Sequence, residues 1–336
     1  MHKDNIGLYI HIPFCEKKCA YCDFYSCIPS EDVINEYLSA LEKQIKKWGG
    51  ELSCPIDTLY IGGGTPSLLG EKIIPLIENV RDNFYLSENA EITAELNPCS
   101  AKGFLRSARI AGVNRLSIGV QSGSDKMLKV LGRNHTREDA INTVKQAREL
   151  GFDNISVDLM IGLVESDINS LKADIDFILC LNPDHISSYI LKIEEKTAFA
   201  KMADKLNLPD DDQIAEQYLY MCERLKSAGF EHYEISNFAK PKKQSRHNLK
   251  YWQCREYLGL GPAAHSYIGG ERFYYPSNLK DFINSPQLIS DGNGGDSKER
   301  LMLGLRLSEG IDLTEIYSEI HPKYYLKYLL LVKRDI

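Results

Sequence analysis

Three cysteines near the amino terminus are the residues of this chain best suited to inorganic chemistry. Cys15, Cys19 and Cys22 have the spacing C-x3-C-x2-C and follow the apolar run 8–12. A disulfide would leave one thiol over, and a structural zinc ion normally takes four nitrogen or sulfur ligands. Three thiolates can hold three irons of a [4Fe–4S] cluster and leave the fourth iron open for a small chelating ligand. Three unrelated buried cysteines, or a zinc site completed from elsewhere in the chain, are the plainer alternatives.

A glycine run, 62–64, lies after the second apolar run and is followed by Thr65 and Pro66. Glycine lets backbone N–H and C=O groups come very close to a ligand. The run lacks the lysine of a phosphate-binding P-loop and the spacing of a dinucleotide fingerprint, so it does not predict a nucleotide triphosphate site. Taken alone, it indicates a tight turn.

Strand and helix patterns alternate along the first part of the chain. Short β-branched or aromatic runs predict six strands, with segments of helical period between them. Six such units predict a parallel sheet with right-handed crossovers, which means a full or partial β/α barrel or a doubly wound sheet. The strands are expected at 7–12, 56–61, 90–96, 114–120, 154–161 and 185–191, and the helices at 31–48, 72–84, 137–150 and 168–181.

Nearly every unusual polar or glycine-rich motif comes just after one of these strands. In parallel α/β folds the carboxyl ends of the strands form the mouth of the active site, so we expect the motifs to face one another. The cysteine loop follows the first strand and the glycine run follows the second. The others are Glu95-Leu96-Asn97-Pro98 after the third strand, Gln121-Ser122-Gly123 after the fourth, Asp158 late in the fifth, and Lys192 and Glu194 after the sixth.

Composition describes a globular protein. The 336 residues are 43% hydrophobic and 26% charged, and they suffice for a barrel-sized domain plus a smaller one. No apolar run is long enough to span a bilayer, and residues 1–5 do not resemble a signal peptide, so a cytoplasmic location is expected. The net charge of −7 and the lack of a basic run argue against nucleic acid as a partner.

Nine cysteines, an odd number, fit a reducing compartment and a metal site better than a disulfide framework. We expect the six outside the cluster motif to be ordinary small residues that are buried or half-buried. They are Cys27, Cys54, Cys99, Cys180, Cys222 and Cys254.

The pattern of the chain changes after about residue 209. Residues 1–209 are expected to form the barrel, and 210–277 an extension that begins with a long amphipathic helix at 210–228. Residues 278–297 are rich in Gly, Asn, Asp, Ser and Pro, which is typical of a linker. Residues 298–336 are expected to form a short helical domain.

The motif C-x3-C-x2-C, with Tyr21 before its last cysteine, resembles the signature of radical S-adenosylmethionine (SAM) enzymes. The string Tyr-Ile-His-Ile-Pro-Phe-Cys at 9–15 resembles the branch of oxygen-independent coproporphyrinogen III oxidases and HemW-type haem chaperones. The similarity continues at intervals to about Arg306. It implies a partial (β/α)6 TIM-like barrel with a small, mainly helical C-terminal domain. It also implies that SAM chelates the fourth iron and that an electron from the cluster, supplied by a reductant such as flavodoxin or ferredoxin, splits SAM into methionine and a 5′-deoxyadenosyl radical.

The resemblance implies a set of SAM-binding residues. A carboxylate suits the ribose hydroxyls of SAM, and an arginine suits its carboxylate. For single members a plainer role stays open, such as a core aromatic for the tyrosine or a solvated turn for the arginine. The set is Tyr9, Gly63, Gly64, Thr65, Glu95, Gln121, Arg133 and Asp158, and Cys15, Cys19 and Cys22 are the cluster ligands.

Two features separate the members of this branch. The oxidases carry a fourth cysteine two residues after the third, whereas this chain has Phe24 there, as HemW-type proteins do. The string from His247 to Trp252 resembles the HNxxYW motif linked with haem binding, which implies that His247, Tyr251 and Trp252 contact haem. Generic chemistry alone favours a packed aromatic cluster with a satisfied histidine. His265 is a weaker second candidate.

The resemblance therefore implies a HemW-type protein that binds haem as cargo and delivers it to acceptor proteins. Loss of haem binding on His247→Ala substitution is the expected consequence. The alternative is oxidative decarboxylation of coproporphyrinogen III in porphyrin biosynthesis, which would use the same cluster and SAM residues. A barrel with a structural zinc ion and no radical chemistry is a third interpretation. It leaves the glycine run and the strand-end motifs unexplained.

Overall fold

Six parallel strands, neighbours in chain order, form the centre of this computed structural model, which describes residues 5–312. Within the described sheet, β1 borders β9 and β6 borders β8, so the barrel stays open between β1 and β6. This confirms the predicted partial (β/α)6 barrel. The strands are β1 (Ile6–Ile12), β2 (Ile56–Gly63), β3 (Leu86–Leu96), β4 (Arg115–Gln121), β5 (Ile155–Ile161) and β6 (His185–Ile190), each close to its predicted range.

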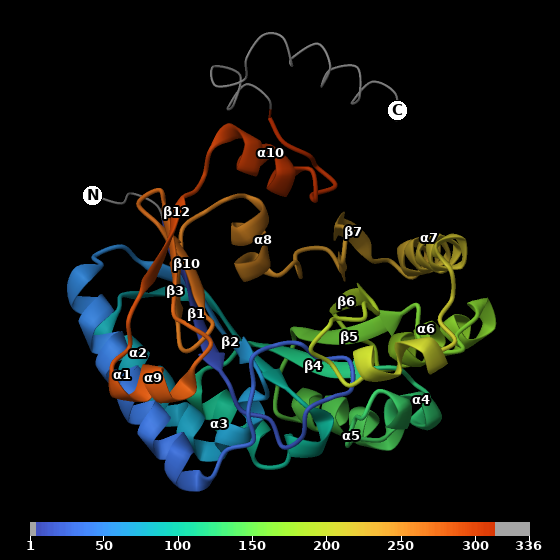
Figure 1. Cartoon of the computed structure of the whole chain (residues 1–336), viewed down its shortest axis with the longest axis horizontal. Helices are drawn as coiled ribbons and strands as arrows, with labels where there is room; N and C mark the ends of the chain where they lie inside the picture. The colour runs from blue at the N-terminus through green and yellow to red at the C-terminus, as the bar shows by residue number, and fades with distance from the viewer. Residues whose placement is uncertain (1–4, 313–336) are drawn as a thin grey trace.

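Helices cover the outer face of these strands (Figure 1). The α1 helix begins where the Ser30 side chain accepts a hydrogen bond from the Val33 N–H, which is a standard N-terminal cap. The helices are α1 (Glu31–Glu51), α2 (Ile73–Asn83), α3 (Phe104–Ala111), α4 (Asp125–Val130), α5 (Arg137–Glu149) and α6 (Ile168–Cys180), with short 3-10 turns η1 (Pro66–Lys72), η2 (Pro98–Ser100) and η3 (Ala200–Lys205).

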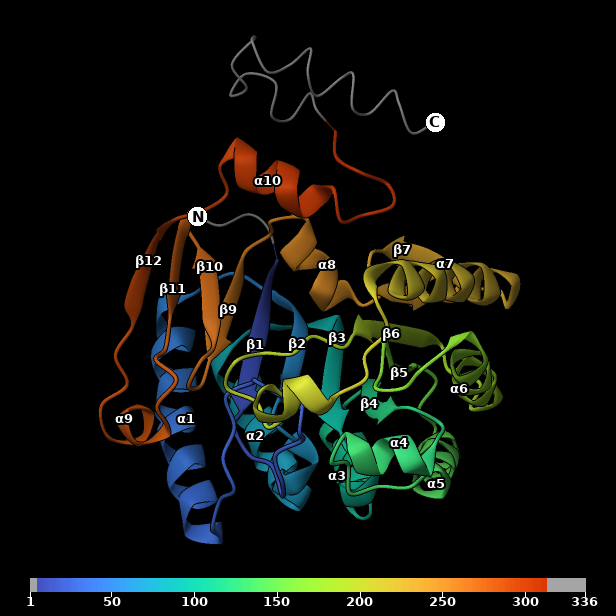
Figure 2. The same ribbon diagram turned by 45° about the vertical axis from the view of Figure 1, so that its right-hand side comes forward.

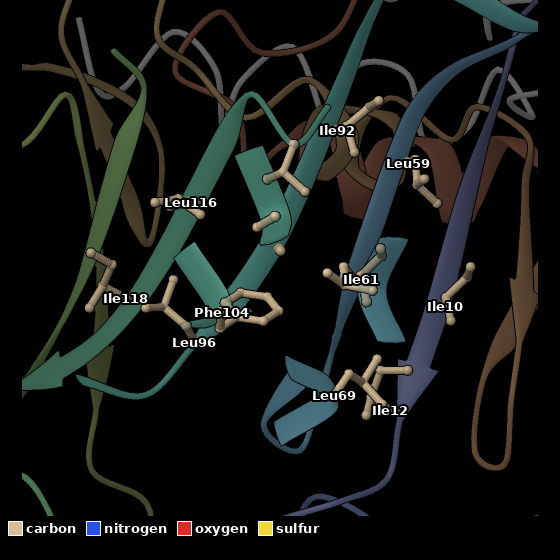
Figure 3. Close-up of a cluster of buried hydrophobic side chains, with 14 of the residues drawn as sticks. Ile10, Ile12, Leu59, Ile61, Leu69, Ile92, Leu96, Phe104, Leu116 and Ile118 are labelled. Carbon is tan, nitrogen blue, oxygen red and sulfur yellow. The ribbon is translucent and has the colours of Figure 1, made fainter. Parts of the chain in front are cut away.

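The hydrophobic core lies between the strands and these helices. Figure 3 shows Ile10 and Ile61, which are register partners on β1 and β2, and, on the other side of the cluster, Phe104 of α3 beside Leu96. Successive side chains of a strand point to opposite faces, so the residues between these apolar positions point into the barrel. That inner face carries polar side chains, which is how the sequence builds a site inside a packed fold.

The chain after β6 extends the same sheet in both directions. α7 (Asp211–Ser227) matches the predicted amphipathic helix, and β9 pairs with β1 in parallel. α8 lies at the end of the barrel where β1 begins, opposite the cysteine loop (Figure 2). The remaining elements are β7 (Glu231–Glu234), β8 (Asn237–Ala239), α8 (Arg246–Trp252), β9 (Tyr257–Leu260), β10 (His265–Ile268) and β11 (Glu271–Tyr274).

The segment expected as a linker, 278–297, is instead part of the fold. It contains α9 (Leu279–Asn284) and β12 (Ile289–Asn293), and β12 pairs with β11. Leu279 and Phe282 of α9 are buried, and the Phe282 ring lies 5.7 Å from the ring of Tyr37 on α1. The composition was misleading because β12 is an exposed edge strand and needs few apolar residues.

The predicted C-terminal domain begins with α10 (Ser297–Gly304), and its residues 313–336 lie outside the described part of the chain. Among residues 5–312, no helix has the length and apolar character needed to cross a membrane.

Candidate functional site

A cavity of about 500 Å³ lies at the carboxyl ends of the six barrel strands. It brings together the motifs that the sequence places after separate strands, which confirms that they face one another. The predicted residues that line it are Cys15, Cys19, Cys22, Gly63, Gly64, Thr65, Glu95, Gln121, Arg133 and Asp158.

The loop that carries the three cysteines is fixed at its base. The Cys15 N–H donates to the Cys27 carbonyl at 2.9 Å, and the Cys27 N–H donates to the Pro13 carbonyl at 2.8 Å. His11 Nε2 lies 3.0 Å from the Tyr25 carbonyl, which can only accept, so Nε2 carries the proton. His11 Nδ1 then accepts from the Tyr9 hydroxyl at 2.9 Å. Burial lowers the pKa of His11, in keeping with a neutral structural ring.

Tyr9 is not among the residues that line the cavity. It is half-buried on β1, and its hydroxyl is engaged with His11. This geometry gives no support to the predicted contact with SAM. It assigns Tyr9 to the support of the cysteine loop through His11.

Two of the three thiols accept hydrogen bonds from neighbouring side chains, whereas burial raises the pKa of the third, Cys22. The Thr65 hydroxyl donates to Cys15 Sγ at 3.6 Å, and Arg133 Nη1 donates to Cys19 Sγ at 3.7 Å. A hydroxyl and a guanidinium are both hydrogen-bond donors, so they can orient sulfur atoms that ligate a metal. All nine cysteines are free, so no disulfide competes for the three.

The three cluster-motif cysteines line one cavity. Within residues 5–312, no three His, Cys, Asp or Glu side chains converge closely enough to hold a single metal ion. In a [4Fe–4S] cluster each thiolate binds a different iron, so the thiolates surround the group and do not meet at one point. Three thiols around one cavity match that requirement.

The glycine run is tight for a steric reason. Gly63 has φ 110°, which favours glycine, and a Cβ on Gly64 would lie 2.5 Å from the Phe14 carbonyl oxygen. The Gly64 N–H donates to the Ile12 carbonyl at 2.8 Å, and the Thr65 N–H donates to the Phe14 carbonyl at 2.7 Å. The run is therefore a tight turn and also one wall of the cavity, packed directly on the cysteine loop.

Two carboxylates face this cavity. Glu95 accepts from the Gly63 N–H at 2.9 Å and from the Tyr60 hydroxyl at 2.7 Å, while burial raises its pKa. Burial, and next the negative charge of Glu95, raise the pKa of Asp158 to about 7. The Ser117 hydroxyl donates to Asp158 at 3.4 Å. Arg115 lowers both pKa values, and Arg133 also lowers that of Asp158, but burial outweighs these charges. Both carboxyl groups would therefore gain from a further positive charge, such as the sulfonium of a ligand.

Two further groups point to a ligand. Gln121 has φ 71°, an uncommon conformation for a residue with a side chain, where the register of β4 and β5 shifts. Asn97 Oδ1 is buried and has no hydrogen-bond partner among the described residues. Buried polar atoms are normally paired, so an unpaired acceptor on a cavity wall indicates a missing donor. With these residues the donor set fits SAM.

The sequence prediction missed several lining residues. Ser117 and Gly119 precede Gln121 by four and two residues, so strand alternation places all three on the same face of β4. That alternation was the available signal. Asn97 was noted only as part of a strand-end string, and Tyr189 of β6 also lines the cavity.

The HNxxYW motif lies on α8, at the opposite end of the barrel from this cavity (Figure 2). His247 is 1% exposed. Its Nδ1 is hydrogen-bonded to the Thr58 hydroxyl at 2.8 Å and its Nε2 to the Tyr251 hydroxyl at 2.9 Å. Burial lowers its pKa to about 3. Both ring nitrogens are hydrogen-bonded and the ring is enclosed, so this geometry gives no support to the predicted haem contact of His247.

The neighbours of His247 are those of a packed core residue. Its ring stacks on Tyr60 at 5.3 Å between centroids, and its backbone N–H donates to Glu91 at 3.1 Å. The Tyr251 hydroxyl is hydrogen-bonded to His247. The guanidinium carbon of Arg306 lies 4.2 Å from the centroid of the Trp252 ring. The packed aromatic cluster is thus the better interpretation for all three predicted haem residues.

The second haem candidate, His265, is exposed and stacks on the neighbouring Tyr274 at 5.0 Å. Among the six other cysteines, Cys54 is buried, and Cys27, Cys222 and Cys254 are half-buried, as predicted. Cys99 and Cys180 are exposed, against prediction. They lie on a surface turn and at the end of α6, where a small side chain has no core to join.

Known proteins resemble this chain over most of its length. The family model described as "Radical SAM superfamily" matches residues 9–178. "Heme chaperone HemW" of Bacillus subtilis is 38% identical over 323 residues, which cover 90% of this chain and 84% of that protein. The Escherichia coli protein of the same name is 40% identical over 271 residues, covering 78% of this chain and 70% of that one.

A solved structure gives the fold. The coproporphyrinogen III oxidase HemN from Escherichia coli superposes with a TM-score of 0.84 and covers 98% of this chain and 83% of its own, at 24% identity. At that identity the likeness shows the architecture alone. Taken with the HemW relatives and the cavity lined by three cysteines, it leaves one assignment: the chain belongs to the radical SAM superfamily and, within it, to the HemW-type family.

Proposed function

We propose that this protein binds haem and delivers it to acceptor proteins, with a [4Fe–4S] cluster and SAM as its cofactors. The similarity to proteins named heme chaperone HemW, which covers 90% of the chain for the Bacillus subtilis protein, is the observation that carries this function. Phe24 supports it, because this side chain lines the cavity at the position where the oxidases have their fourth cysteine. Decarboxylation of coproporphyrinogen is the second candidate, favoured only by the shared architecture.

The residues around the cavity divide into roles. When bound, the cluster and SAM supply one-electron radical chemistry. We assign the irons to Cys15, Cys19 and Cys22, with Thr65 and Arg133 stabilising two of the thiolates. Gly63, Gly64, Thr65 and Glu95 form the wall that would take the ammonium group of SAM, and Gln121, Arg133 and Asp158 form the wall that would take its ribose and carboxylate.

Titration of the cluster-loaded protein with haem tests the proposed function. We expect a saturable change in the haem absorption spectrum, with a dissociation constant in the micromolar range or tighter, because a chaperone has to compete with non-specific haem adsorption. Incubation with SAM, a reductant and coproporphyrinogen III is expected to leave the substrate unchanged by mass spectrometry. Two successive losses of carbon dioxide, each with two hydrogens, would replace the proposal by the oxidase activity.

The affinity for SAM is expected to fall as the pH drops below 7. The pKa of Asp158 is raised to about 7 without a ligand, whereas a ribose with two hydroxyl donors and a sulfonium requires the charged carboxylate. Binding below pH 7 therefore releases a proton from Asp158, which lowers the affinity by up to about tenfold per pH unit. Equilibrium dialysis of SAM at pH 8 and pH 6, with iron content checked in each sample, measures this slope.

The matched variant is Asp158→Asn, which keeps the shape of the side chain but cannot titrate. It is expected to bind SAM more weakly at pH 8 and to show a smaller pH slope, with Glu95 responsible for what remains. A wild-type affinity that does not change between pH 8 and pH 6 would show that Asp158 does not contact SAM.

Two properties of the chain remain predictions. The electron donor is expected to be a small reductant of the flavodoxin or ferredoxin type. A cytoplasmic location is expected from the sequence, and fractionation of the host cell would test it.

A further inference from the structure

Three large apolar side chains stand exposed at the rim of the cavity. Phe24 of the cysteine loop is 66% exposed, and Tyr189 and Ile190 at the end of β6 are 47% and 49% exposed. All three line the same cavity, and Met160 and Leu191 continue its apolar surface inward. An exposed aromatic and aliphatic group on a cavity rim is informative, because such residues are normally buried unless they meet a partner.

Lysines surround this apolar rim. Lys17, Lys18 and Lys192 also line the cavity. Lys18 donates to the Phe24 carbonyl at 2.7 Å, and Lys192 pairs with Glu194 at 2.7 Å. Asp23 lies close enough to Lys192 to influence its charge, which places the tip of the cysteine loop beside the segment after β6. Three cations and two carboxylates, Asp23 and Glu194, thus face the rim.

The rim differs in chemistry from the interior of the cavity. The interior carries hydroxyl, amide and carboxylate groups that account for a polar ligand of the SAM type. The adenine ring of SAM can use only part of this apolar surface. Phe24, Tyr189 and Ile190 are each about half exposed or more, so we assign the rim to a second ligand. That ligand should be flat and apolar on its faces and should carry carboxylates at its edge.

We propose that the rim formed by Phe24, Tyr189 and Ile190 is the haem site, with Lys18 and Lys192 receiving the haem propionates. The inference rests on the proposed function and specifies the location of the haem-binding site. Aromatic and aliphatic side chains pack on a porphyrin face, and lysines give charge-assisted hydrogen bonds to carboxylates. Haem at this place lies across the mouth of the cavity, over the cluster loop, with its other face open to an acceptor protein.

Haem at this site is expected to affect the binding of SAM. A macrocycle over the mouth contacts the same loop whose base holds the cluster cysteines, from Cys15 to Cys22. Haem binding therefore slows the release of SAM from the cavity beneath, and the off-rate of SAM is expected to fall when haem is present.

Haem titration of two rim variants tests the proposal. Phe24→Ala and Ile190→Ser are expected to weaken haem binding at least tenfold each, with iron content and SAM affinity within twofold of wild type. Their matched controls are Tyr85→Ala and Ile110→Ser, since Tyr85 and Ile110 are 68% and 67% exposed elsewhere on the surface. The controls are expected to bind haem as wild type does.

A second set of variants tests the contacts between the lysines and the haem propionates. Lys192→Gln is expected to weaken haem binding at least threefold but to leave binding of haem dimethyl ester unchanged, whereas Lys196→Gln on the same segment changes neither. Wild-type haem affinity in the Phe24→Ala/Ile190→Ser double variant would overturn the rim site while leaving the chaperone function intact. Absence of saturable haem binding by the wild-type protein would overturn the chaperone function itself.

Discussion

Replacement of Cys19 by alanine is expected to reduce the iron and sulfide of the reconstituted protein from about four of each per chain to near background. Cys19 Sγ accepts from Arg133, and the loop offers only two other thiols at the cavity. Two thiolates do not retain the cluster, and SAM loses the iron that would chelate it. SAM binding is therefore expected to fall to the detection limit as well. Iron and sulfide analysis and equilibrium dialysis measure the two losses.

The other cysteines near the site supply the controls. Cys27 contributes its backbone N–H and C=O to the base of the loop, and an alanine retains both. Cys99 is exposed and donates to Glu16 at 3.6 Å. Cys27→Ala and Cys99→Ala are therefore expected to keep full iron content. Normal iron in Cys19→Ala, or equal losses in all three variants, would contradict the assignment of the cluster ligands.

The barrel and its cavity were predictable because both follow from local periodicity. A strand with alternating side chains has one apolar face for the helices and one polar face for the interior, and this pattern is visible in Tyr60 and Ile61 or in Ser117 and Ile118. Parallel order then places every strand end on the same side. The strand pattern and the parallel order were therefore enough to predict that Cys15, Glu95 and Asp158 lie around one cavity.

The environment of His247 was not predictable, since its partners are far away in sequence. Thr58 lies 189 positions before it, and Glu91, which accepts from its backbone, lies 156 positions before it. The sequence pattern of a histidine with flanking aromatics is the same for a haem ligand and for a buried core residue. The prediction of a linker at 278–297 was wrong for a related reason. Leu279 and Phe282 are buried, and Phe282 packs on Tyr37 of α1, which is far away in sequence.

His247→Ala is expected to destabilise the protein by about 3 kcal/mol. The substitution leaves the hydroxyls of Thr58 and Tyr251 buried without their partner, at roughly 1–3 kcal/mol for each unsatisfied group, and it opens a cavity beside Tyr60. Urea denaturation at pH 7 measures the difference in the free energy of unfolding. The matched control is His265→Ala, which removes an exposed ring and is expected to change the stability by less than about 0.5 kcal/mol.

The pH dependence of this difference identifies its cause. The folded-state pKa of His247 is lowered to about 3, below its ordinary value of 6.5, so the unfolded chain binds a proton between these values and the folded chain does not. The stabilisation due to His247 is therefore complete above pH 6.5 and is lost as the pH falls, at about 1.4 kcal/mol per unit. At pH 5 the gap between wild type and His247→Ala is expected to be smaller by about 2 kcal/mol.

Haem binding by the same variant decides between the two interpretations of the motif. If α8 closes the barrel opposite the cavity, folded His247→Ala protein retains its haem affinity, and any loss follows the unfolded fraction seen by circular dichroism. If His247 were an iron ligand, haem affinity would fall in protein that has kept its stability. The hydrogen bonds from both ring nitrogens favour the first outcome, because a ring whose removal costs a buried network cannot be lost without a change in stability. Retained haem affinity would then separate the family motif from the haem site and direct attention to the rim around Phe24 and Tyr189.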